Sequence, residues 1–332
     1  NQHYSNIMSK VFFNFFKITG KIYNIYPNKE SQASFFSESV NSIEKILKIN
    51  TPNFLITQGD TNTGLAGCMA ASLINRNLEY KDKIKIVHIE AGLRSFDDTM
   101  PEEINRKLID QMSHILFPPT RFDFENLKRD NCLKSKRTFI VGNTITDVLK
   151  EYVPAANKSK ILEKLKLIKK KYFLVTLHRP ESVDIKKNLS SLLKTLKALY
   201  KKYKYPIIFP IHPRTKNNMK KLNLSFDKNI KIIEPLEYLE FLKLMKDSKL
   251  ILSDSGGIQE EASILGVPCV TLRTTTERQI TLLRKVNIMA GYSQNKILKA
   301  VEEFHNKNIK KINDFGSGNV TNKIYKKLTS LI

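Results

Sequence analysis

Short apolar segments alternate with amphipathic stretches along most of the chain. The apolar segments are nearly continuous runs of Ile, Leu, Val and Phe, which is typical of strands buried on both faces. The stretches between them repeat apolar residues at the helical period. We predict strands at residues 53–57, 84–89, 114–117, 138–141, 172–176, 206–211, 230–233, 249–253 and 268–272. This alternation predicts an α/β fold in which parallel sheets are flanked by helices.

The chain of 332 residues is long enough for two domains of ordinary size. A polar, lysine-rich stretch at residues 153–171 contains Pro154, and the alternation of strands and helices begins again after it. We therefore predict two Rossmann-like domains, an N-terminal one at residues 1–152 and a C-terminal one at residues 153–312. Residues 313–332 form a separate C-terminal segment.

Polar segments follow five of the predicted strands, with the sequences QGDT, EAGLRSFDDTMPEE, HRPES, HPRT and SDSGG. In open α/β sheets, ligands bind beyond the carboxyl ends of the strands. Five polar motifs at equivalent strand ends are harder to attribute to chance than any one of them. They predict an active site in the cleft between the two domains.

In SDSGG, the residues Ser255, Gly256 and Gly257 occupy the turn before a predicted helix. Backbone N–H groups at such a turn suit a phosphate, although an ordinary helix start with Ser255 as N-cap explains the motif equally well. Glu261 follows about 9 Å along the helix, where a carboxylate could hold ribose hydroxyls. Arg278 is a candidate second phosphate contact, with a surface charge as the alternative.

Carboxylates near strand ends form a second candidate group. Asp60 lies in QGDT, Glu90 ends the strand at residues 84–89, and Glu102 starts a helix after a proline. Each has a structural alternative: Asp60 suits a helix cap, and Glu90 could pair with Arg94. Glu102 and Glu103 are favourable charges in a first helical turn. Carboxylates that share a site can divide acid and base roles if their pKa values differ.

The best-placed histidines and cations are His178 and Arg179 in HRPES and His212 and Arg214 in HPRT. The other histidines, at positions 3, 88, 114 and 305, are interpreted as structural, because a lone histidine more often is.

Composition narrows the classes of function. The formal net charge of +24 favours a nucleic-acid partner. However, the basic runs are scattered at predicted helix ends, so we interpret the charge as biased composition and predict no nucleic-acid partner. The three cysteines lie far apart and indicate neither a disulfide framework nor a metal site. Without an apolar run of membrane-spanning length or a signal-peptide pattern, we expect a cytoplasmic protein with no stable membrane insertion.

Between residues 58 and 279 the chain contains, in order, QGDTNT, HIEAGLRSFDDTMPEEINR, VGNTITDVL, LVTLHRPESVD, FPIHPRT, SDSGGIQEEA and the TER of TTTERQ. This ordered set resembles the non-hydrolysing UDP-N-acetylglucosamine 2-epimerase family, which has two Rossmann-like domains in the GT-B arrangement. Weaker similarity extends to NQHYSNIM near the N-terminus and DFGSGNVTNKIYKKL near the C-terminus. The set is far more specific than a lone glycine motif.

The resemblance implies reversible inversion at C2 of UDP-N-acetylglucosamine (UDP-GlcNAc) to give UDP-N-acetylmannosamine (UDP-ManNAc). It implies elimination of UDP to 2-acetamidoglucal and re-addition of UDP, with no cofactor and no metal. It also implies a cytoplasmic homodimer that serves cell-surface polysaccharide biosynthesis, with a C-terminal helix that crosses back to the N-terminal domain. The catalytic residues it implies are Asp60, Glu90, Glu102 and His178. The UDP-binding residues it implies are Arg179, His212, Ser255, Gly256, Gly257, Glu261 and Arg278.

Two departures from the family pattern affect these expectations. The family begins with a strand and a Gly-Thr-Arg-Pro-Glu loop that this chain lacks, so we expect this chain to be a fragment of a longer enzyme, without the first β-α-β unit. Gln279 and Ile280 stand where the family usually has Pro-Glu after TER, which affects the contacts of that loop. Residues 24–40 do not match cleanly the allosteric UDP-GlcNAc site of some bacterial members, so the presence of that site stays open.

Three other functions remain open. A GT-B glycosyltransferase would share the sheets and the nucleotide site, but it would not need the acidic residues around C2. An epimerase of a UDP-diacetamido-uronic acid would keep the motifs and change the sugar pocket. A nucleic-acid-binding protein would bind DNA in a salt-sensitive way, without any effect of UDP.

Overall fold

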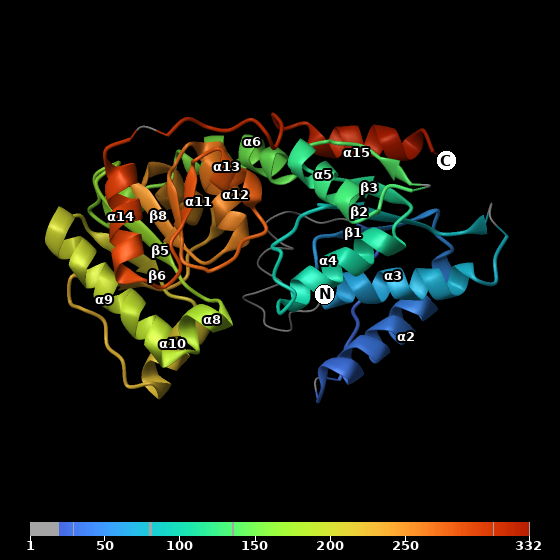
Figure 1. The fold of residues 1–332 in the computed structure, drawn as a ribbon, viewed down its shortest axis with the longest axis horizontal. Helices are drawn as coiled ribbons and strands as arrows, with labels where there is room; N and C mark the ends of the chain where they lie inside the picture. The colour runs from blue at the N-terminus through green and yellow to red at the C-terminus, as the bar shows by residue number, and fades with distance from the viewer. Residues whose placement is uncertain (1–19, 29, 80–81, 135, 308, 332) are drawn as a thin grey trace. The chain divides into compact units, whose positions relative to one another are not determined.

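The computed structural model describes residues 20–331 apart from positions 29, 80–81, 135 and 308 (Figure 1). The segment NQHYSNIM, which carries part of the family resemblance, lies outside the described residues. Contacts divide the chain into two compact units. Unit 1 comprises Asn1–Leu93, Asp97–Ile140 and Thr329–Ile332, and unit 2 comprises Arg94–Phe96 and Val141–Leu328. The main division by contacts thus falls after Ile140, and the domain boundaries given above stay predictions.

Unit 1 is built on a four-stranded parallel sheet in the order β1-β2-β3-β4. Its strands are β1 (Phe54–Gln58), β2 (Lys85–Ile89), β3 (Ile115–Phe117) and β4 (Arg137–Thr138). Its helices are α2 (Gln32–Asn50), α3 (Asn62–Asn75), α4 (Pro101–Met112) and α5 (Arg121–Arg129). The register pairs Gln58 with Ile89 at the carboxyl ends of β1 and β2. The segments that follow these two strands therefore start side by side.

Unit 2 is built on a six-stranded parallel sheet in the order β10-β9-β8-β5-β6-β7. Its strands are β5 (Phe173–Thr176), β6 (Ile207–Pro210), β7 (Ile230–Ile233), β8 (Leu250–Ser253), β9 (Cys269–Thr271) and β10 (Asn287–Met289). The strand order reverses at β5, which pairs with β8 on one side and β6 on the other. Such a switch point creates a crevice beyond the strand ends, where ligands of doubly wound sheets bind.

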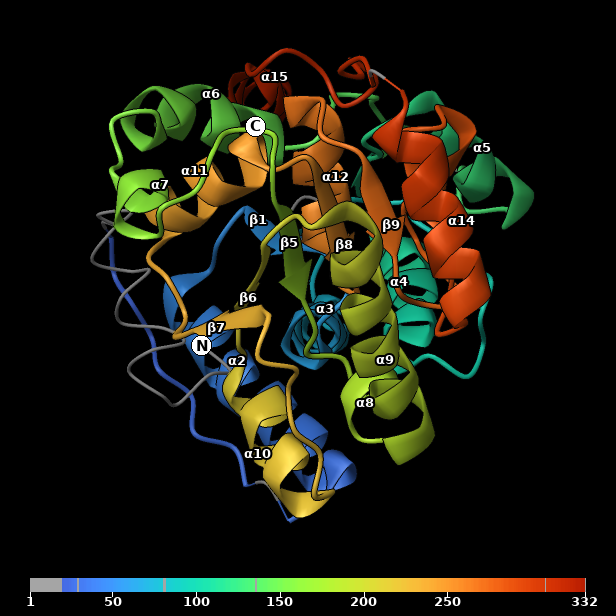
Figure 2. The ribbon, with the colours of Figure 1, turned by 90° about the vertical axis from the view of Figure 1, so that its left-hand side faces the viewer.

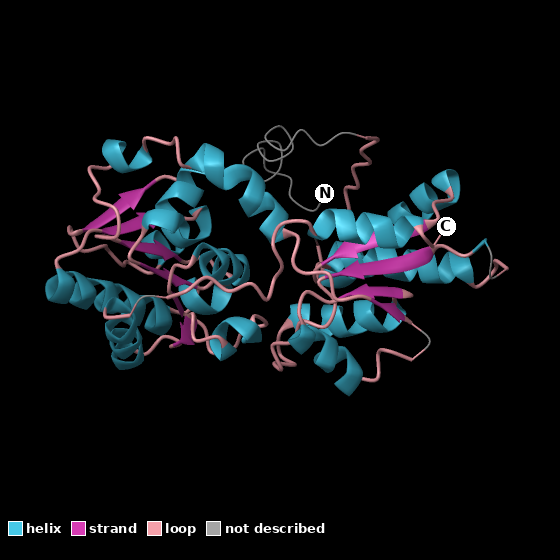
Figure 3. Cartoon of the chain, turned by 90° about the horizontal axis from the view of Figure 1, so that it is seen from above, coloured by secondary structure: helices cyan, strands magenta, loops and turns pink. Residues whose placement is uncertain are grey.

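Helices cover both faces of the sheets (Figure 3). Those of unit 2 are α6 (Ile145–Ala156), α7 (Ile161–Lys164), α8 (Pro180–Val183), α9 (Lys186–Tyr203), α10 (Pro213–Lys221), α11 (Tyr238–Asp247), α12 (Gly256–Leu265), α13 (Gln279–Leu283), α14 (Gln294–His305) and most of α15 (Val320–Thr329). Successive strand residues point to opposite faces. Phe173 and Val175 pack in a core with α9 and α14, whereas Leu174 packs in a second core with α6, α11 and α12. Figure 2 shows α9 and α14 on one side of β5 and β8, and α6 and α11 on the other.

All nine predicted strands are confirmed, with ends that differ by a few residues at most. A tenth strand, β10, was missed because it is only three residues long and starts with a polar residue. Asn287 is nevertheless buried and accepts a hydrogen bond from Thr271 Oγ1 at 2.8 Å. The burial of this amide depends on a partner in a neighbouring strand, which no local pattern reveals. None of the helices in the described part of the chain has the length and apolarity needed to cross a membrane.

Candidate active site

Asp60 follows β1 in unit 1, after a turn at Gly59 with φ +70°. Its carboxylate is held by Arg106 of α4, whose Nε and Nη2 atoms are 2.9 and 2.8 Å from Asp60 Oδ2. The Asn105 amide also donates to the Asp60 backbone carbonyl at 2.9 Å. Asp60 is 29% exposed and Arg106 is buried. One carboxylate edge is therefore fixed from the protein side while the side chain stays accessible.

Two adjacent glutamates at the start of α4 point in different directions. Glu103 is fully buried, and its Oε2 atom accepts a hydrogen bond from Arg106 Nη1 at 2.6 Å. Glu102 is half-buried and lines a cavity of about 890 Å³ together with Asp60 and Asn105. The sequence prediction chose Glu102 over Glu103. Only Glu102 shares this cavity with Asp60, whereas Glu103 anchors the arginine that holds Asp60.

Glu90 follows β2 with φ +71°, a left-handed conformation that is uncommon for a residue with a Cβ atom. Its Oε1 atom accepts a hydrogen bond from Gln58 Nε2 at 2.9 Å, and a Cβ on Gly59 would lie 4.0 Å from its Oε2 atom. The Glu90 carboxylate therefore lies near Gln58 and Gly59, the two residues that precede Asp60. Non-glycine residues in this backbone region cluster at functional sites.

At the switch point of unit 2, the SDSGG turn leads from β8 into α12. Ser255 is the N-cap residue, as the structural alternative supposed, but its side chain makes no capping hydrogen bond among the described residues. A Cβ on Gly256 would lie 2.4 Å from Glu277 Oε1, so any larger residue would require that carboxylate to move. Gly257 is exposed, with open space where its side chain would be. The first N–H groups of α12 thus lack the usual hydroxyl cap.

Glu261 lies on the next turn of α12. The residue is half-buried, but its Oε2 atom is buried without a hydrogen-bond partner among the described residues. Burial raises the pKa of the Glu261 carboxyl to about 7. A buried carboxylate oxygen without a partner is costly unless a ligand donates to it.

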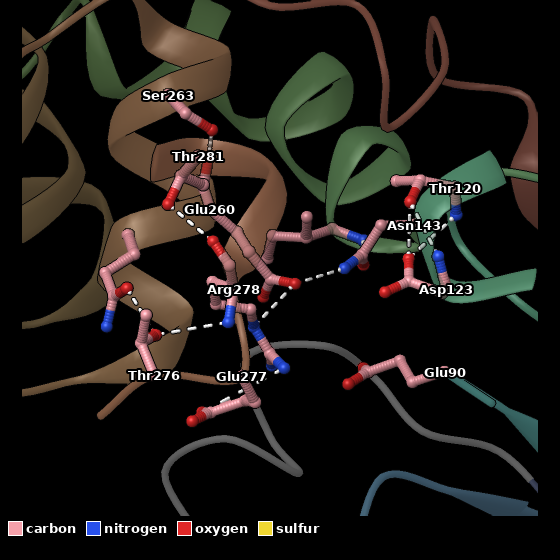
Figure 4. A network of polar contacts seen from close by, with 12 residues as sticks. Glu90, Thr120, Asp123, Asn143, Glu260, Ser263, Thr276, Glu277, Arg278 and Thr281 are labelled. Atoms are coloured by element: carbon pink, nitrogen blue, oxygen red, sulfur yellow. Dashed lines mark hydrogen bonds and ion pairs between the residues drawn. The ribbon is translucent and has the colours of Figure 1, made fainter. Parts of the chain in front are cut away.

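Arg278 belongs to a buried network that sequence reasoning did not find (Figure 4). Its Nε atom is 2.8 Å from Glu260 Oε1, and its Nη1 atom is 4.0 Å from Glu277 Oε1. Asn143 donates to the same Glu260 oxygen at 2.7 Å. Gln279, one of the departures from the family pattern, donates to the Thr276 carbonyl at 2.7 Å. Two carboxylates therefore orient Arg278, and Gln279 closes the turn before it.

Asp254, between β8 and the glycine turn, organises the HRPES segment. Its Oδ2 atom accepts hydrogen bonds from the backbone N–H groups of His178 and Arg179, both at 2.9 Å. Its Oδ1 atom is 3.0 Å from His178 Nδ1. Burial acts to raise the pKa of Asp254, but the hydrogen bonds from His178 and Arg179 outweigh it and lower that pKa. The Asp254 carboxylate thus fixes His178 with its Nδ1 atom turned inward.

His212 faces His178, with ring centroids 5.6 Å apart. Its Nδ1 atom accepts a hydrogen bond from the Arg214 N–H at 3.1 Å, so that nitrogen carries no proton. Burial, then the neighbouring His178, lowers the pKa of His212. The Arg214 guanidinium instead forms an ion pair with exposed Asp184. Of the two HPRT candidates, His212 faces the histidine after β5, while Arg214 pairs at the surface.

The candidate residues thus form two groups, one in each unit. Asp60, Glu90 and Glu102 belong to unit 1, and the UDP candidates with His178 belong to unit 2. No cluster of three or more His, Cys, Asp or Glu residues with metal-binding geometry occurs in the described part of the chain. The prediction that both groups meet in an interdomain cleft stays a prediction. Sequence reasoning missed Arg106, Asn143, Asp254 and Glu260, although all four lie within the quoted motifs HIEAGLRSFDDTMPEEINR, VGNTITDVL and SDSGGIQEEA.

Comparison with known proteins identifies the family of this chain. The family model described as UDP-N-acetylglucosamine 2-epimerase matches residues 1–329. A UDP-N-acetylglucosamine 2-epimerase of Methanocaldococcus jannaschii is 44% identical over 99% of this chain and 89% of its own length. A UDP-2,3-diacetamido-2,3-dideoxy-D-glucuronate 2-epimerase of Pseudomonas aeruginosa is 33% identical over 99% of this chain and 90% of its own length.

Solved structures give the same result. A crystal structure of the M. jannaschii UDP-GlcNAc 2-epimerase in complex with UDP-GlcNAc and UDP matches with a TM-score of 0.90 and 43% identity. The match covers 99% of this chain and 90% of that one. Such neighbours have the GT-B fold, which confirms the predicted fold class.

Proposed function

This chain belongs to the UDP-N-acetylglucosamine 2-epimerase family and is an isomerase, and we propose that it inverts C2 of UDP-GlcNAc by eliminating and re-adding UDP. The observation that carries the proposal is the acidic group of unit 1. Asp60 and Glu102 line one cavity, and Glu90 is held in a left-handed backbone conformation beside the end of β1. A transferase has no need for three carboxylates around the C2 position of a donor sugar.

The chemistry explains why elimination is required. The C2 proton of the sugar has no adjacent carbonyl, so its direct removal would leave a carbanion without stabilisation. In the proposed route, a base takes the C2 proton while the C1–O bond to UDP breaks, and a C1–C2 double bond forms in 2-acetamidoglucal. UDP oxygen then attacks C1 while an acid protonates C2 from the opposite face. Each step balances without a redox partner.

In this proposal the residues of unit 2 hold UDP. The backbone N–H groups at Gly256 and Gly257 bind the diphosphate at the start of α12, a favourable position for an anion. The Glu261 carboxylate accepts hydrogen bonds from ribose hydroxyls, which satisfies the Oε2 atom that has no partner among the described residues. Arg278, Arg179, His212, His178 and Ser255 complete the UDP site. A firm hold on UDP is needed because the leaving group must return.

The carboxylates of unit 1 exchange protons with C2 in this proposal. Arg106 fixes one edge of the Asp60 carboxylate, so its other edge is oriented for a single face of the sugar. Glu90 and Glu102 supply the remaining acid and base groups, and His178 assists departure of UDP. Inversion needs at least one group on each face, and three carboxylates meet that need.

A second candidate substrate is the UDP-diacetamido-glucuronate of the P. aeruginosa relative, which is 33% identical to this chain. The 44% identity to the M. jannaschii enzyme favours UDP-GlcNAc. We also propose that the enzyme works as a cytoplasmic homodimer that supplies cell-surface polysaccharide biosynthesis, as the family resemblance implies. Light scattering coupled to size-exclusion chromatography tests the dimer.

The experiment that tests the reaction is proton NMR of UDP-GlcNAc in D2O with the purified protein. We expect the C2 proton signal to disappear while UDP-ManNAc accumulates. UDP-2,3-diacetamido-glucuronate, tested in parallel, should react at least tenfold more slowly. Exchange of the uronate alone would assign the chain to the second substrate. Binding of UDP with an unchanged spectrum for both sugars would contradict the epimerase.

A further inference from the structure

A buried histidine and a buried aspartate connect the two strand ends of unit 1 that carry candidate catalytic carboxylates. His88 lies on β2, and Asp110 lies near the end of α4. Both side chains are fully buried, and His88 Nδ1 is 2.6 Å from Asp110 Oδ1. The proposed function gives neither residue a role. Burying two such polar groups in a core is justified energetically only if their hydrogen bonds are well made.

One contact of this pair reaches the turn that presents Asp60. His88 Nε2 is 2.9 Å from the carbonyl oxygen of Gly59, the residue immediately before Asp60. The left-handed conformation of Gly59, with φ +70°, ends β1 and directs the chain toward α3. The Gly59 N–H also donates to the Ile89 carbonyl at 3.1 Å. Both backbone polar groups of Gly59 are thus tied to β2.

The other contact reaches the turn that presents Glu90. Asp110 Oδ2 accepts a hydrogen bond from the N–H of Gly92, two residues after Glu90, at 3.2 Å. On its other side, the Gly92 carbonyl accepts a hydrogen bond from Asn126 Nδ2 at 2.9 Å. A Cβ on Gly92 would lie 2.2 Å from the backbone carbonyl oxygen of Asp123, so the turn is tightly packed.

These contacts explain how Glu90 keeps its unusual backbone. A non-glycine residue in the left-handed region costs on the order of 1–3 kcal/mol, and it persists only where the surroundings determine the conformation. The hydrogen bonds to Gly92 supply that constraint on one side of Glu90, and the Gly59 N–H to the Ile89 carbonyl supplies it on the other. Asp110 also anchors α4, whose first turn carries Glu102.

We propose that His88 and Asp110 are positioning residues for the epimerisation, because their pair sets the turns that present Asp60 and Glu90 to the sugar. The inference rests on the proposed function, since it requires these carboxylates to exchange protons at C2. Neither side chain touches the substrate in this account. A misplacement of about 1 Å in a reacting group can cost roughly 10²-fold in rate. His88 and Asp110 therefore affect the rate of epimerisation through the positions of the Asp60 and Glu90 carboxylates.

Four substitutions separate the two contacts. His88→Gln places its amide near the Nε2 position and keeps a donor for Gly59, whereas His88→Asn places its amide near Nδ1 and keeps a donor for Asp110. His88→Ala removes both contacts. Asp110→Asn preserves shape but cannot accept from both His88 and Gly92. We expect kcat to fall roughly 10²-fold in His88→Ala and Asp110→Asn, and by less in the two amide variants.

A histidine elsewhere in the same sheet supplies the matched control. His114 Nδ1 accepts a hydrogen bond from the Ile86 N–H at 3.0 Å, near the amino ends of the strands. His114→Gln therefore disturbs a side-chain contact to backbone without touching the turns at Gly59 and Gly92. We expect it to leave kcat unchanged and to lower the melting temperature slightly.

The measurements are kcat and KM for UDP-GlcNAc, UDP affinity by calorimetry, and the isotope effect on kcat with substrate deuterated at C2. In His88→Ala and Asp110→Asn we expect a lower kcat, unchanged UDP affinity and a larger isotope effect, because misplaced carboxylates slow proton transfer selectively. A kcat that falls only with the folded fraction, with an unchanged isotope effect, would overturn the inference. If the wild type itself fails to exchange the C2 proton, the proposed function fails first.

Discussion

The candidate catalytic carboxylates Asp60 and Glu90 of unit 1 differ from the candidate ribose ligand Glu261 of unit 2 in their hydrogen-bond partners. In unit 1, Asp60 is paired with buried Arg106, and Glu90 is held by a hydrogen bond from Gln58. In unit 2, Glu261 has a buried oxygen with no hydrogen-bond partner among the described residues, and burial raises its pKa to about 7. The two carboxylates of unit 1 are already oriented by the protein. Glu261 retains hydrogen-bonding capacity that a ligand can use.

This difference matches the two tasks in the proposed reaction. Proton transfer at C2 demands fixed distances, so the groups that carry it out gain from rigid internal partners. Binding of UDP demands unused acceptors and donors, such as the Glu261 carboxylate and the uncapped start of α12. Mutations in unit 1 should therefore affect proton transfer at C2, and mutations in the UDP site of unit 2 should affect UDP binding. Mutations in both units that affected the same step would contradict this difference.

The largest effect is expected for the carboxylates of unit 1. Glu90→Gln and Asp60→Asn should each lower the rate of C2 proton exchange by about 10²–10⁴-fold, because they remove an acid or base. UDP affinity should stay unchanged, since the proposed UDP site lies in unit 2. Exchange is measured by NMR in D2O and affinity by calorimetry.

Asp98→Asn is the matched control for those variants. Asp98 is 83% exposed and pairs with Lys107 on α4 at 2.6 Å. The substitution therefore removes a carboxylate next to α4 without changing the cavity that Asp60 and Glu102 line. Normal exchange in Glu90→Gln would remove Glu90 from the reaction.

The next effect concerns the arginine that holds Asp60. Arg106→Met should lower both the exchange rate and the free energy of unfolding, the latter by about 3–5 kcal/mol, because buried Glu103 loses its ion-pair partner. Lys107→Met removes a partly exposed ion pair on the same helix and should cost about 0–1 kcal/mol. Urea unfolding measures both. Equal losses in the two variants would show that the Arg106 network is no more important than a surface pair.

Asp254→Asn tests the partner of His178. We expect kcat to fall by about tenfold to 10²-fold, because His178 loses a charged partner that orients its ring. The folded-state pKa of Asp254 is lowered, so this group stabilises the fold above its unfolded pKa, near 3.9, and that stability is lost as pH falls through its folded pKa. The variant should therefore lose less stability between pH 5 and pH 2 than the wild type. An identical acid profile would contradict the assignment.

The smallest effect is a pH dependence of UDP binding. Because the pKa of Glu261 is raised to about 7, its carboxyl is largely protonated at pH 6 and ionised at pH 8. Ribose hydroxyls donate to the ionised form, so UDP affinity should rise with pH, by at most about tenfold per pH unit below pH 7. Glu261→Gln should bind UDP more weakly and lose this component, while the titration of UDP phosphate itself remains. A profile shared by both proteins would exclude Glu261 from the ribose contact.

Much of this architecture could be predicted from the sequence. Continuous apolar runs predicted the parallel strands, and polar motifs at their ends predicted the positions of Asp60, Glu90 and Ser255. Side-chain partners could not be predicted in the same way. Asp254 is 76 residues from His178, and Glu260 is 117 residues from Asn143, so each pairing exists only after the sheet of unit 2 has formed.

His88 illustrates the same limit within unit 1. His88 is a lone histidine in an apolar strand, and the sequence pattern therefore favours a structural role. The role proposed above depends on its contacts with Gly59 and Asp110, which lie elsewhere in the sequence. Glu103 shows the same limit. Its position predicts a favourable charge in the first turn of a helix, but the structure shows a buried ion-pair partner of Arg106.

The most direct test of the central claim is positional isotope exchange. UDP-GlcNAc is prepared with ¹⁸O in the bond between C1 and the β-phosphate, and its ³¹P spectrum is followed during epimerisation. Elimination frees the β-phosphate of UDP to rotate, so the account predicts that ¹⁸O moves into non-bridging positions at a rate comparable to epimerisation. Epimerisation with the ¹⁸O retained in the bridge would show that UDP is not released from C1 with a β-phosphate free to rotate, and would contradict this account of elimination and re-addition.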